Sequence, residues 1–308
     1  MAASAVVPKA KVISFKNILL ATDLSDDSEK AFNYAVAVAR CHGSKIFLMH
    51  VMPPEALSFI PEFPDERHHD EARRQLESLA SRRALNQISH ETVLRTGSVW
   101  SMVSAVIRQR DIELVVLGTH GRSGLKKLVL GSVAEEVVRR AACPVLTVGP
   151  HIDANLTKSG VFQRILYATD FHSASSKALD YALHLANEPG AQLVLLHVMP
   201  PAALPGSARG FWDEPAINRW HDKVKANITE KLRRLLPAGA KLWSEPEYVV
   251  SFDFLADGIL KTAAARNADL IITGAKRPAF VKVSAHSLGG VSYEVIRRAN
   301  CPVLTVSA

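Results

Sequence analysis

The sequence contains little cysteine and has no long apolar run. Its three cysteines, Cys41, Cys143 and Cys301, form neither a C-x-x-C pair nor an even set, so buried structural thiols are favoured over disulfide, redox or metal roles. No apolar stretch approaches the roughly 20 residues that span a bilayer. Pro8 and Lys9 interrupt the leading apolar segment, so a secretory signal is not expected either. We therefore expect a cytoplasmic protein without a membrane span.

Aromatic residues are also scarce, which bears on the positive charge of the chain. The 308 residues carry a formal net charge of +7, yet only 6% are aromatic, and no motif interleaves aromatic with basic side chains. The basic residues come as short pairs, such as Arg139 and Arg140, at the ends of expected helices, where cations complement the helix dipole. Nucleic acid is therefore not an expected partner.

What the sequence does contain is a duplication. KNILLATDLSDDSEKAFNYAVAVARCHGSKIFLMHVMPP, from Lys16, is echoed by QRILYATDFHSASSKALDYALHLANEPGAQLVLLHVMPP, from Gln163. EVVRRAACPVLTV, from Glu136, returns as EVIRRANCPVLTV, from Glu294. The offset between the copies grows from 147 to 158 positions, so the second copy carries extra residues in its middle. We predict two tandem domains at 1–150 and 161–308, joined by a linker near 150–160.

Each copy alternates short β-branched runs with longer segments of helical periodicity. This order is typical of a doubly wound α/β domain with a five-stranded parallel sheet flanked by helices. The expected strands are 18–21, 46–51, 91–94, 114–117 and 145–148 in the first copy, and 165–167, 193–198, 248–250, 270–273 and 303–306 in the second. The expected helices follow the turn at 23–26 as far as about 40, then 71–85, 99–109 and 132–140, and in the second copy 175–186, 216–236, 255–266 and 291–299.

A glycine-rich segment follows the fourth expected strand of the first copy. Gly118 and Gly121 open it, and Gly131 and Ser132 close it in front of a helix. Glycine lets the backbone approach a ligand closely, and a helix N-terminus favours an anion, so this segment suits a phosphate. Ser132 and Glu135 have the spacing of a capping box, which predicts that the helix begins at Ser132. A simple turn and cap is the alternative interpretation.

The helix that follows places Val133, Val137 and Val138 on one predicted apolar face. The glycines are not followed by GKS or GKT, and GxGxxG is absent, so neither a Walker loop nor a dinucleotide fingerprint is present. The basic residues within the segment, Arg122, Lys126 and Lys127, either neutralise phosphate charge or face solvent. His120, in the same segment, is a further candidate for a phosphate contact.

Asp23 stands directly after the first expected strand, at the edge where ligands bind in such sheets. Its carboxylate suits a ribose hydroxyl pair or a phosphate-bound cation, and capping of the following helix is the alternative. His50 and His197 end buried strands and are predicted to be hydrogen-bonded core residues. The adjacent His68 and His69 point to different helix faces, which is poor metal geometry.

The spacing Gly-x2-Gly-x9-Gly-Ser resembles the ATP-binding motif of the universal stress protein family, and KNILLATDLS with LMHVM is similar to the opening of its members. The resemblance covers nearly the whole chain and implies an adenine nucleotide alpha hydrolase-like fold that binds ATP, with Mg²⁺ on the phosphates. It implies that Asp23 contacts the ribose, that Ala21 and Thr22 flank the base, and that Val51 and Leu117 pack on adenine. The phosphate contacts it implies are Gly118, Gly121, Gly131, Ser132 and Val133, through backbone amides and the Ser132 hydroxyl. Arg122 is added to these candidates for its positive charge and not from the resemblance.

The second copy departs from this motif. Gly274 is present, but Arg277 stands where the second glycine belongs, and the closing pair is Gly289 and Gly290 without a serine. Asp170 remains, yet the phosphate cradle is incomplete. We therefore expect weak or absent ATP binding in the second copy.

No nucleophile stands at a recognisable spacing from a base, so an enzyme is not the first expectation. The resemblance implies an ATP-binding regulator in stress response, in which nucleotide occupancy is coupled to assembly or partner binding. It also implies dimerisation through the last strand, as a homodimer or as a domain pair within one chain. A slow ATP hydrolase or nucleotidyl transferase is the alternative, and an interaction module without a ligand is a third hypothesis.

Overall fold

The computed structural model describes residues 13–25, 28–52, 66–119, 130–150, 152, 162–200, 214–275 and 290–307. The strands of the first copy are β1 (Asn17–Ala21), β2 (Lys45–Met52), β3 (His90–Thr96), β4 (Leu114–Gly118) and β5 (Val145–Val148). Those of the second copy are β6 (Arg164–Ala168), β7 (Gln192–Met199), β8 (Glu247–Phe252), β9 (Leu270–Ala275) and β10 (Val303–Ser307). The two copies are therefore doubly wound α/β units, as the element order predicts.

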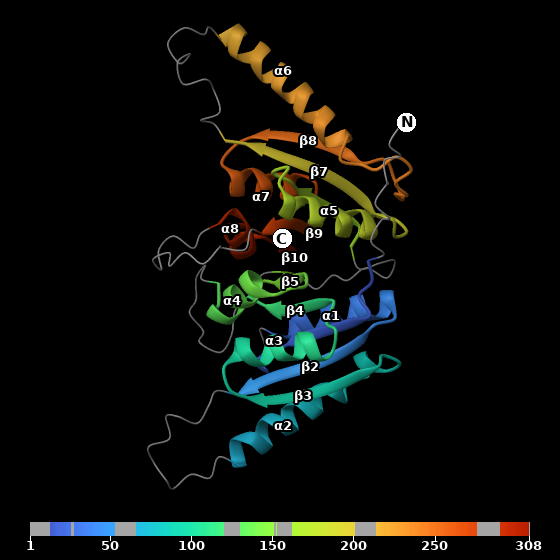
Figure 1. Ribbon diagram of the computed structural model, residues 1–308, viewed down its shortest axis with the longest axis vertical. Helices are drawn as coiled ribbons and strands as arrows, with labels where there is room; N and C mark the ends of the chain where they lie inside the picture. Colours follow the sequence, from blue (N-terminus) through green and yellow to red (C-terminus); the bar gives the residue numbers. More distant parts are fainter. Residues whose placement is uncertain are drawn as a thin grey trace, which may run out of the picture.

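The described strands form one ten-stranded sheet in the order β3-β2-β1-β4-β5-β10-β9-β6-β7-β8. Figure 1 shows this sheet running the length of the molecule, with β3 and β8 toward the two ends and β5 and β10 in the middle. Within each copy the strands are parallel. The second strand pairs with one edge of the first strand and the fourth strand with its other edge, so the order of the strands reverses between the first and the fourth. Ala21 pairs with Leu117, so β1 and β4 end at the same level. This is the switch point where such sheets bind ligands.

The two copies join through their last strands. β5 and β10 pair antiparallel, and Leu146 lies opposite Leu304. Two aromatic contacts cross the joint, and each links one copy to the other: Phe15 stacks on Tyr181 at 6.0 Å between ring centroids, and Tyr34 stacks on Phe162 at 6.1 Å. Phe15 is equivalent to Phe162 in the duplication, and Tyr34 is equivalent to Tyr181, so each contact is the counterpart of the other. The two copies are therefore related by a pseudo-two-fold axis.

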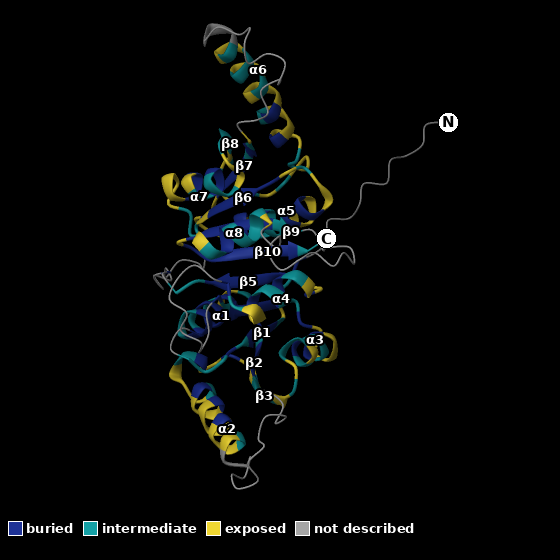
Figure 2. Ribbon diagram, turned by 90° about the vertical axis from the view of Figure 1, so that its left-hand side faces the viewer, coloured by how far each residue is buried: buried dark blue, intermediate teal, exposed yellow. Residues whose placement is uncertain are grey.

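Helices cover both faces of the sheet. One face carries α1 (Glu29–His42), α2 (Glu66–Ala80), α5 (Ser173–Ala186) and α6 (Glu214–Arg233), and the other carries α3 (Val99–Gln109), α4 (Ser132–Arg140), α7 (Leu255–Ala265) and α8 (Val291–Arg298). Each face has one hydrophobic cluster that includes side chains of both copies. Figure 2 shows the central strands buried between these layers. The core is thus continuous across the joint.

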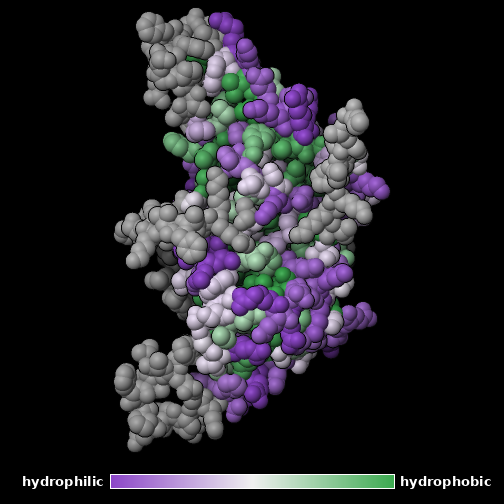
Figure 3. Space-filling model, viewed as in Figure 1, coloured by the Kyte–Doolittle hydropathy of each residue, from purple (hydrophilic) through white to green (hydrophobic). Residues whose placement is uncertain are grey.

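Polar outer faces complete the helical layers. Figure 3 shows hydrophilic side chains along the outer edge of the molecule near α6. α6 is an amphipathic helix, and Ile228 and Leu232 on its inner side belong to the core. In the part of the chain that the structure describes, every helix is too short or too polar to cross a membrane.

Three local predictions need correction. The helix expected at 71–85 ends at Ala80, because Arg82 adopts an extended backbone, and a separate 3-10 turn (η2) follows at Arg83–Leu85. α4 does begin at Ser132, but Gly131 is its N-cap and no side chain caps it, so the predicted capping box is wrong. Val133 is 41% exposed and does not share the buried face of Val137 and Val138.

Candidate functional site

A cavity of about 430 Å³ lies at the carboxyl ends of β1, β2 and β4, between the first turn of α4 and the start of α3. This volume falls within the range of 300–1,000 Å³ that is typical of small-molecule sites. Its walls are largely apolar, with Met49, Val51, Val99, Val103 and Leu117 among the side chains that line it. The residues Thr22, Asp23, Ser28, His50, Thr119 and Ser132 supply polar groups at its edges.

The loop after β1 is built to hold Asp23 at the mouth of this cavity. Asp23 Oδ1 accepts hydrogen bonds from the Ser25 amide at 3.1 Å and the Ser25 hydroxyl at 2.6 Å, which is an Asx turn. Leu24 between them takes a positive φ of 62°. These bonds tie the Asp23 side chain to its own loop, and the N-cap of α1 is Ser28. The alternative interpretation, in which Asp23 caps the helix, is therefore wrong.

Thr22 and His50 form the floor between β1 and β2. The Thr22 amide donates to the Met49 carbonyl at 2.9 Å, and His50 Nδ1 donates to the Thr22 carbonyl at 2.8 Å. The proton of His50 therefore sits on Nδ1. His197 makes the same bond to Thr169 in the second copy, also at 2.8 Å. The prediction that both histidines are hydrogen-bonded residues of the strand ends is confirmed.

The N-terminus of α4 forms the wall opposite Asp23. The Gly131 amide donates to the Thr119 carbonyl at 2.9 Å, so that amide is engaged in the protein backbone and is not directed at a ligand. A Cβ at Gly131 would approach the Thr119 carbonyl to 3.3 Å, which gives this glycine a packing role. The amides of Ser132, Val133 and Ala134 belong to the first turn, where helix geometry provides no intrahelical acceptor.

The structure brings together nine of the eleven residues that the sequence singles out. Ala21, Thr22, Asp23, Val51, Leu117, Gly118, Gly131, Ser132 and Val133 all line the cavity. Gly121 and Arg122 lie outside the described residues, as do His120, Lys126 and Lys127. Sequence reasoning did not assign Ser28, Met49, Val99, Val103, Thr119 and Ala134, which also line the cavity. Val99 and Val103 have helical i, i+4 spacing, a pattern that core residues share.

The equivalent cavity of the second copy is smaller, at about 140 Å³. Its loop repeats the first: Asp170 Oδ1 accepts from the His172 amide at 3.0 Å, and Phe171 takes a φ of 63°. The first turn of α5, however, closes over the end of β9. A Cβ at Gly274 would lie only 2.3 Å from the Ser175 amide nitrogen, so backbone already occupies this space. The room beside Asp170 is about a third of that beside Asp23.

Other features of the described chain do not compete with the first cavity. A depression of about 420 Å³ follows α6 around the exposed Trp243, but it lies before β8, at the amino ends of the strands. Burial raises the pKa of the Cys143 and Cys301 thiols to about 12. The prediction of a buried thiol is wrong for Cys41, which is exposed; partial desolvation and then the Glu188 carboxylate raise the pKa of its thiol to about 11. These thiols keep their protons at neutral pH, so none is an activated nucleophile.

The fold and its cavity define a doubly wound α/β protein with a ligand site at the strand ends, duplicated in tandem. The sequence pattern described as the Universal stress protein family matches residues 14–149 and again 162–307. The chain therefore belongs to the universal stress protein family, and the fold is the adenine nucleotide alpha hydrolase-like α/β fold predicted from the sequence.

Individual relatives agree with this assignment. A protein of Staphylococcus aureus strain USA300, named for the same family, is 31% identical over 144 residues, which cover 44% of this chain and 86% of the relative. A universal stress protein from Archaeoglobus fulgidus superimposes with a TM-score of 0.68 at 24% identity, covering 96% of this chain and 97% of that one. A Pseudomonas aeruginosa UCBPP-PA14 protein assigned to the family gives a TM-score of 0.58 at 16% identity, covering 95% and 93%. The two structural likenesses support the fold.

Proposed function

We propose that the first copy binds ATP in the 430 Å³ cavity and that the chain acts as a nucleotide-dependent regulator. One observation carries the proposal: an apolar cavity runs from a strand-end carboxylate, Asp23, to the N-terminus of α4. An apolar slot suits a base, a carboxylate suits ribose hydroxyls, and a helix N-terminus suits phosphate. The three parts of an adenine nucleotide thus find complementary groups in one cavity.

In this assignment the base lies between Val51 and Leu117, with Ala21 and Thr22 at its edge. Asp23 accepts hydrogen bonds from the ribose. The phosphates lie at Gly118, Ser132 and Val133, where the first-turn amides of α4 and the Ser132 hydroxyl are the donors. Gly121 of the motif and the neighbouring Arg122 complete the phosphate site.

Asp23 is the one charged residue among the described residues that line the cavity, and it is acidic. A triphosphate therefore needs cations from elsewhere. We assign this role to Mg²⁺ on the phosphates and to Arg122, a basic residue of the glycine-rich segment. Nucleotide affinity should accordingly fall when EDTA removes Mg²⁺ from the assay.

Replacement of Asp23 by Asn tests the site with little change of shape. Asn keeps an oxygen that accepts from Ser25, so the loop is retained, whereas the charge that strengthens the ribose hydrogen bonds is lost. Hydrogen bonds to charged groups contribute about 1.5–3 kcal/mol, so the Kd for ATP should rise about 10- to 150-fold in calorimetry. The matched Asp170→Asn variant should leave the Kd within about twofold.

Binding stoichiometry and product analysis complete the test. The wild-type chain should bind one ATP, and Gly121→Leu should abolish binding while Arg277→Leu does not. Nucleotide extracted from the purified protein should remain ATP over hours if the chain is a regulator, and accumulation of ADP with turnover would favour the hydrolase alternative. Equal losses in Asp23→Asn and Asp170→Asn, or no heat with ATP and Mg²⁺, would contradict the assignment.

A further inference from the structure

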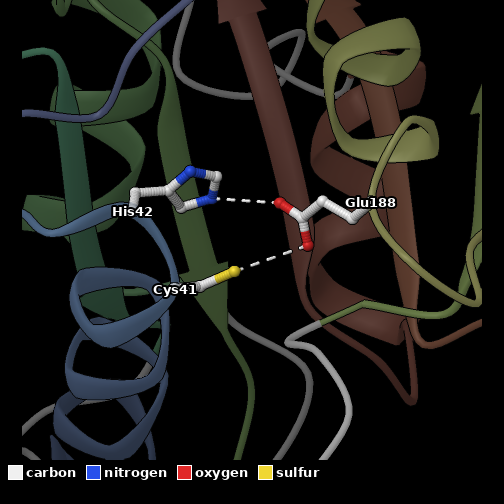
Figure 4. A group of neighbouring side chains, drawn as sticks. All are labelled: Cys41, His42 and Glu188. Atoms are coloured by element: carbon white, nitrogen blue, oxygen red, sulfur yellow. Dashed lines mark hydrogen bonds and ion pairs between the residues drawn. The ribbon is translucent and has the colours of Figure 1, made fainter. Parts of the chain in front are cut away.

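Three side chains with metal-binding atoms meet at the pseudo-two-fold axis, on the opposite face of the sheet from α4. Cys41 and His42 end α1 of the first copy, and Glu188 follows α5 of the second copy. The sulfur, an imidazole nitrogen and a carboxylate oxygen all lie within 4.8 Å of one another. Figure 4 shows Cys41 and His42 of the first copy pointing toward Glu188 of the second copy.

Two distances within this cluster are close to those between ligand atoms of a tetrahedral metal site, and each ends on a different oxygen of Glu188. Cys41 Sγ lies 3.6 Å from Glu188 Oε2, and His42 Nε2 lies 3.2 Å from Glu188 Oε1. Zinc bonds of about 2.3 Å to sulfur and about 2.0–2.2 Å to nitrogen and oxygen place neighbouring ligand atoms about 3.4–3.6 Å apart. Because the three ligand atoms all lie within 4.8 Å of one another, one cation can contact all three residues once the side chains draw together around it.

The cluster is incompletely satisfied by its own contacts. Glu188 Oε1 is buried and makes no hydrogen bond with the described residues, because its contact with His42 lacks hydrogen-bond geometry. A buried carboxylate oxygen without a donor is costly, and a cation at this point would remove the cost. The side chains of His42 and Glu188 are only 14% and 15% exposed, whereas Cys41 is exposed and leaves a path from solvent.

The surroundings also favour a cation. α1 ends at His42 and α5 ends at Ala186, so the negative ends of two helix dipoles converge on the cluster. The His42 ring is held in place by the edge of Phe15 at 5.1 Å and by stacking with His184 at 5.6 Å. Aromatic packing of this kind fixes a ligand ring before a metal arrives.

We propose that Cys41, His42 and Glu188 bind one Zn²⁺ ion that clamps the two copies together at their pseudo-two-fold axis. The donor set of one thiolate, one imidazole and one carboxylate suits zinc, with water in the fourth position. Binding displaces the thiol proton, which passes to solvent. The site is separate from the nucleotide cavity and does not depend on the proposed function.

The test uses full-length protein without an affinity tag, freed of nucleotide and treated with EDTA. Titration with Zn²⁺ alone should show one tight site per chain and a rise in Tm. Titration with Co²⁺ alone should give the near-ultraviolet charge-transfer band of a cobalt thiolate. Cys41→Ser should abolish that band. Cys41→Ser and Glu188→Gln should each weaken Zn²⁺ binding more than about 100-fold, beyond the 10–100-fold typical for groups that only support a ligand.

Two matched variants control for adventitious binding. Cys143→Ser removes a half-buried thiol elsewhere, and His68→Ala removes an exposed histidine of α2; both should bind Zn²⁺ and Co²⁺ like the wild type. The wild-type cobalt spectrum needs no variant, so misfolding of a variant, checked by circular dichroism, does not remove the test. No tight Zn²⁺ site in the wild type, or full affinity in Cys41→Ser and Glu188→Gln, would overturn the proposal and leave a metal-free polar contact.

Discussion

Truncation of the two leucines that face each other across the joint should reveal how far the copies depend on one another. Leu146 of β5 lies directly opposite Leu304 of β10, and they are 1% and 2% exposed in the same hydrophobic cluster. Each Leu→Ala change removes a fully buried side chain and leaves a cavity in a continuous core. From such sites we expect a loss of about 3–5 kcal/mol in the free energy of unfolding for each variant.

The double variant should lose less than the sum of the two single losses. Facing residues of an antiparallel pair have Cβ atoms about 4.5–5.5 Å apart, so the second truncation enlarges a cavity that already exists. Coupling between residues in contact amounts to about 0.5–3 kcal/mol. Leu20→Ala supplies the control: Leu20 is fully buried in β1, three strands or about 14 Å from β10, and its loss should add to that of Leu304→Ala within about 0.5 kcal/mol.

Urea unfolding followed by circular dichroism and tryptophan fluorescence measures these energies. Because both hydrophobic clusters contain residues of both copies, the wild type should unfold in one transition with the same midpoint by both probes. Strict additivity of Leu146→Ala and Leu304→Ala, together with two separate transitions, would refute a single sheet with a shared core. It would indicate two copies that fold independently.

Two further effects follow from individual residues. Burial lowers the pKa of His197 below its ordinary value, so the unfolded state binds more protons as the pH falls through about 6.5, and stability should decline from pH 7 to 5.5. Urea midpoints across this range should decline less steeply in His197→Gln, and an unchanged slope would contradict the argument. Gly43 caps α1 with a φ of 65°, so Gly43→Ala should cost about 1–2 kcal/mol in the same assay. Gly149→Ala, where a Cβ meets Ile152 at an ordinary 3.7 Å, should stay within about 0.5 kcal/mol of the wild type.

Much of this fold could be predicted because each element carries its own local pattern. The strand at Val145–Val148 and the helix at Val99–Gln109 have the predicted bounds, since apolar periodicity and flanking polar residues mark both ends. The errors arise where a local pattern meets a boundary set by distant residues. Val133 matches the apolar face of α4 but lies in its first turn at the rim of the cavity, where the core does not reach.

The cavity itself was only partly predictable. Asp23 and the glycine motif could be recognised from the sequence, because a carboxylate at a strand end together with a glycine loop before a helix indicates a nucleotide site. Val99 and Val103 carry no such signal, because a helix that lines a cavity and one that lines a core have the same amphipathic pattern. The small volume of the cavity beside Asp170 could not be predicted from the sequence either, because it depends on how closely the first turn of α5 approaches Gly274.

The joint shows what a tandem chain gains over a pair of identical chains. A two-fold axis brings equivalent positions together, and Cys41 and Glu188 are equivalent positions of the two copies. Two identical first copies would place a second Cys41 where Glu188 stands, and two identical second copies would place two carboxylates together, with like charges in contact. Duplication followed by divergence allows a thiol and an imidazole from one side to face a carboxylate from the other. The proposed metal site needs residues of both copies, so its occupancy depends on the contact between them.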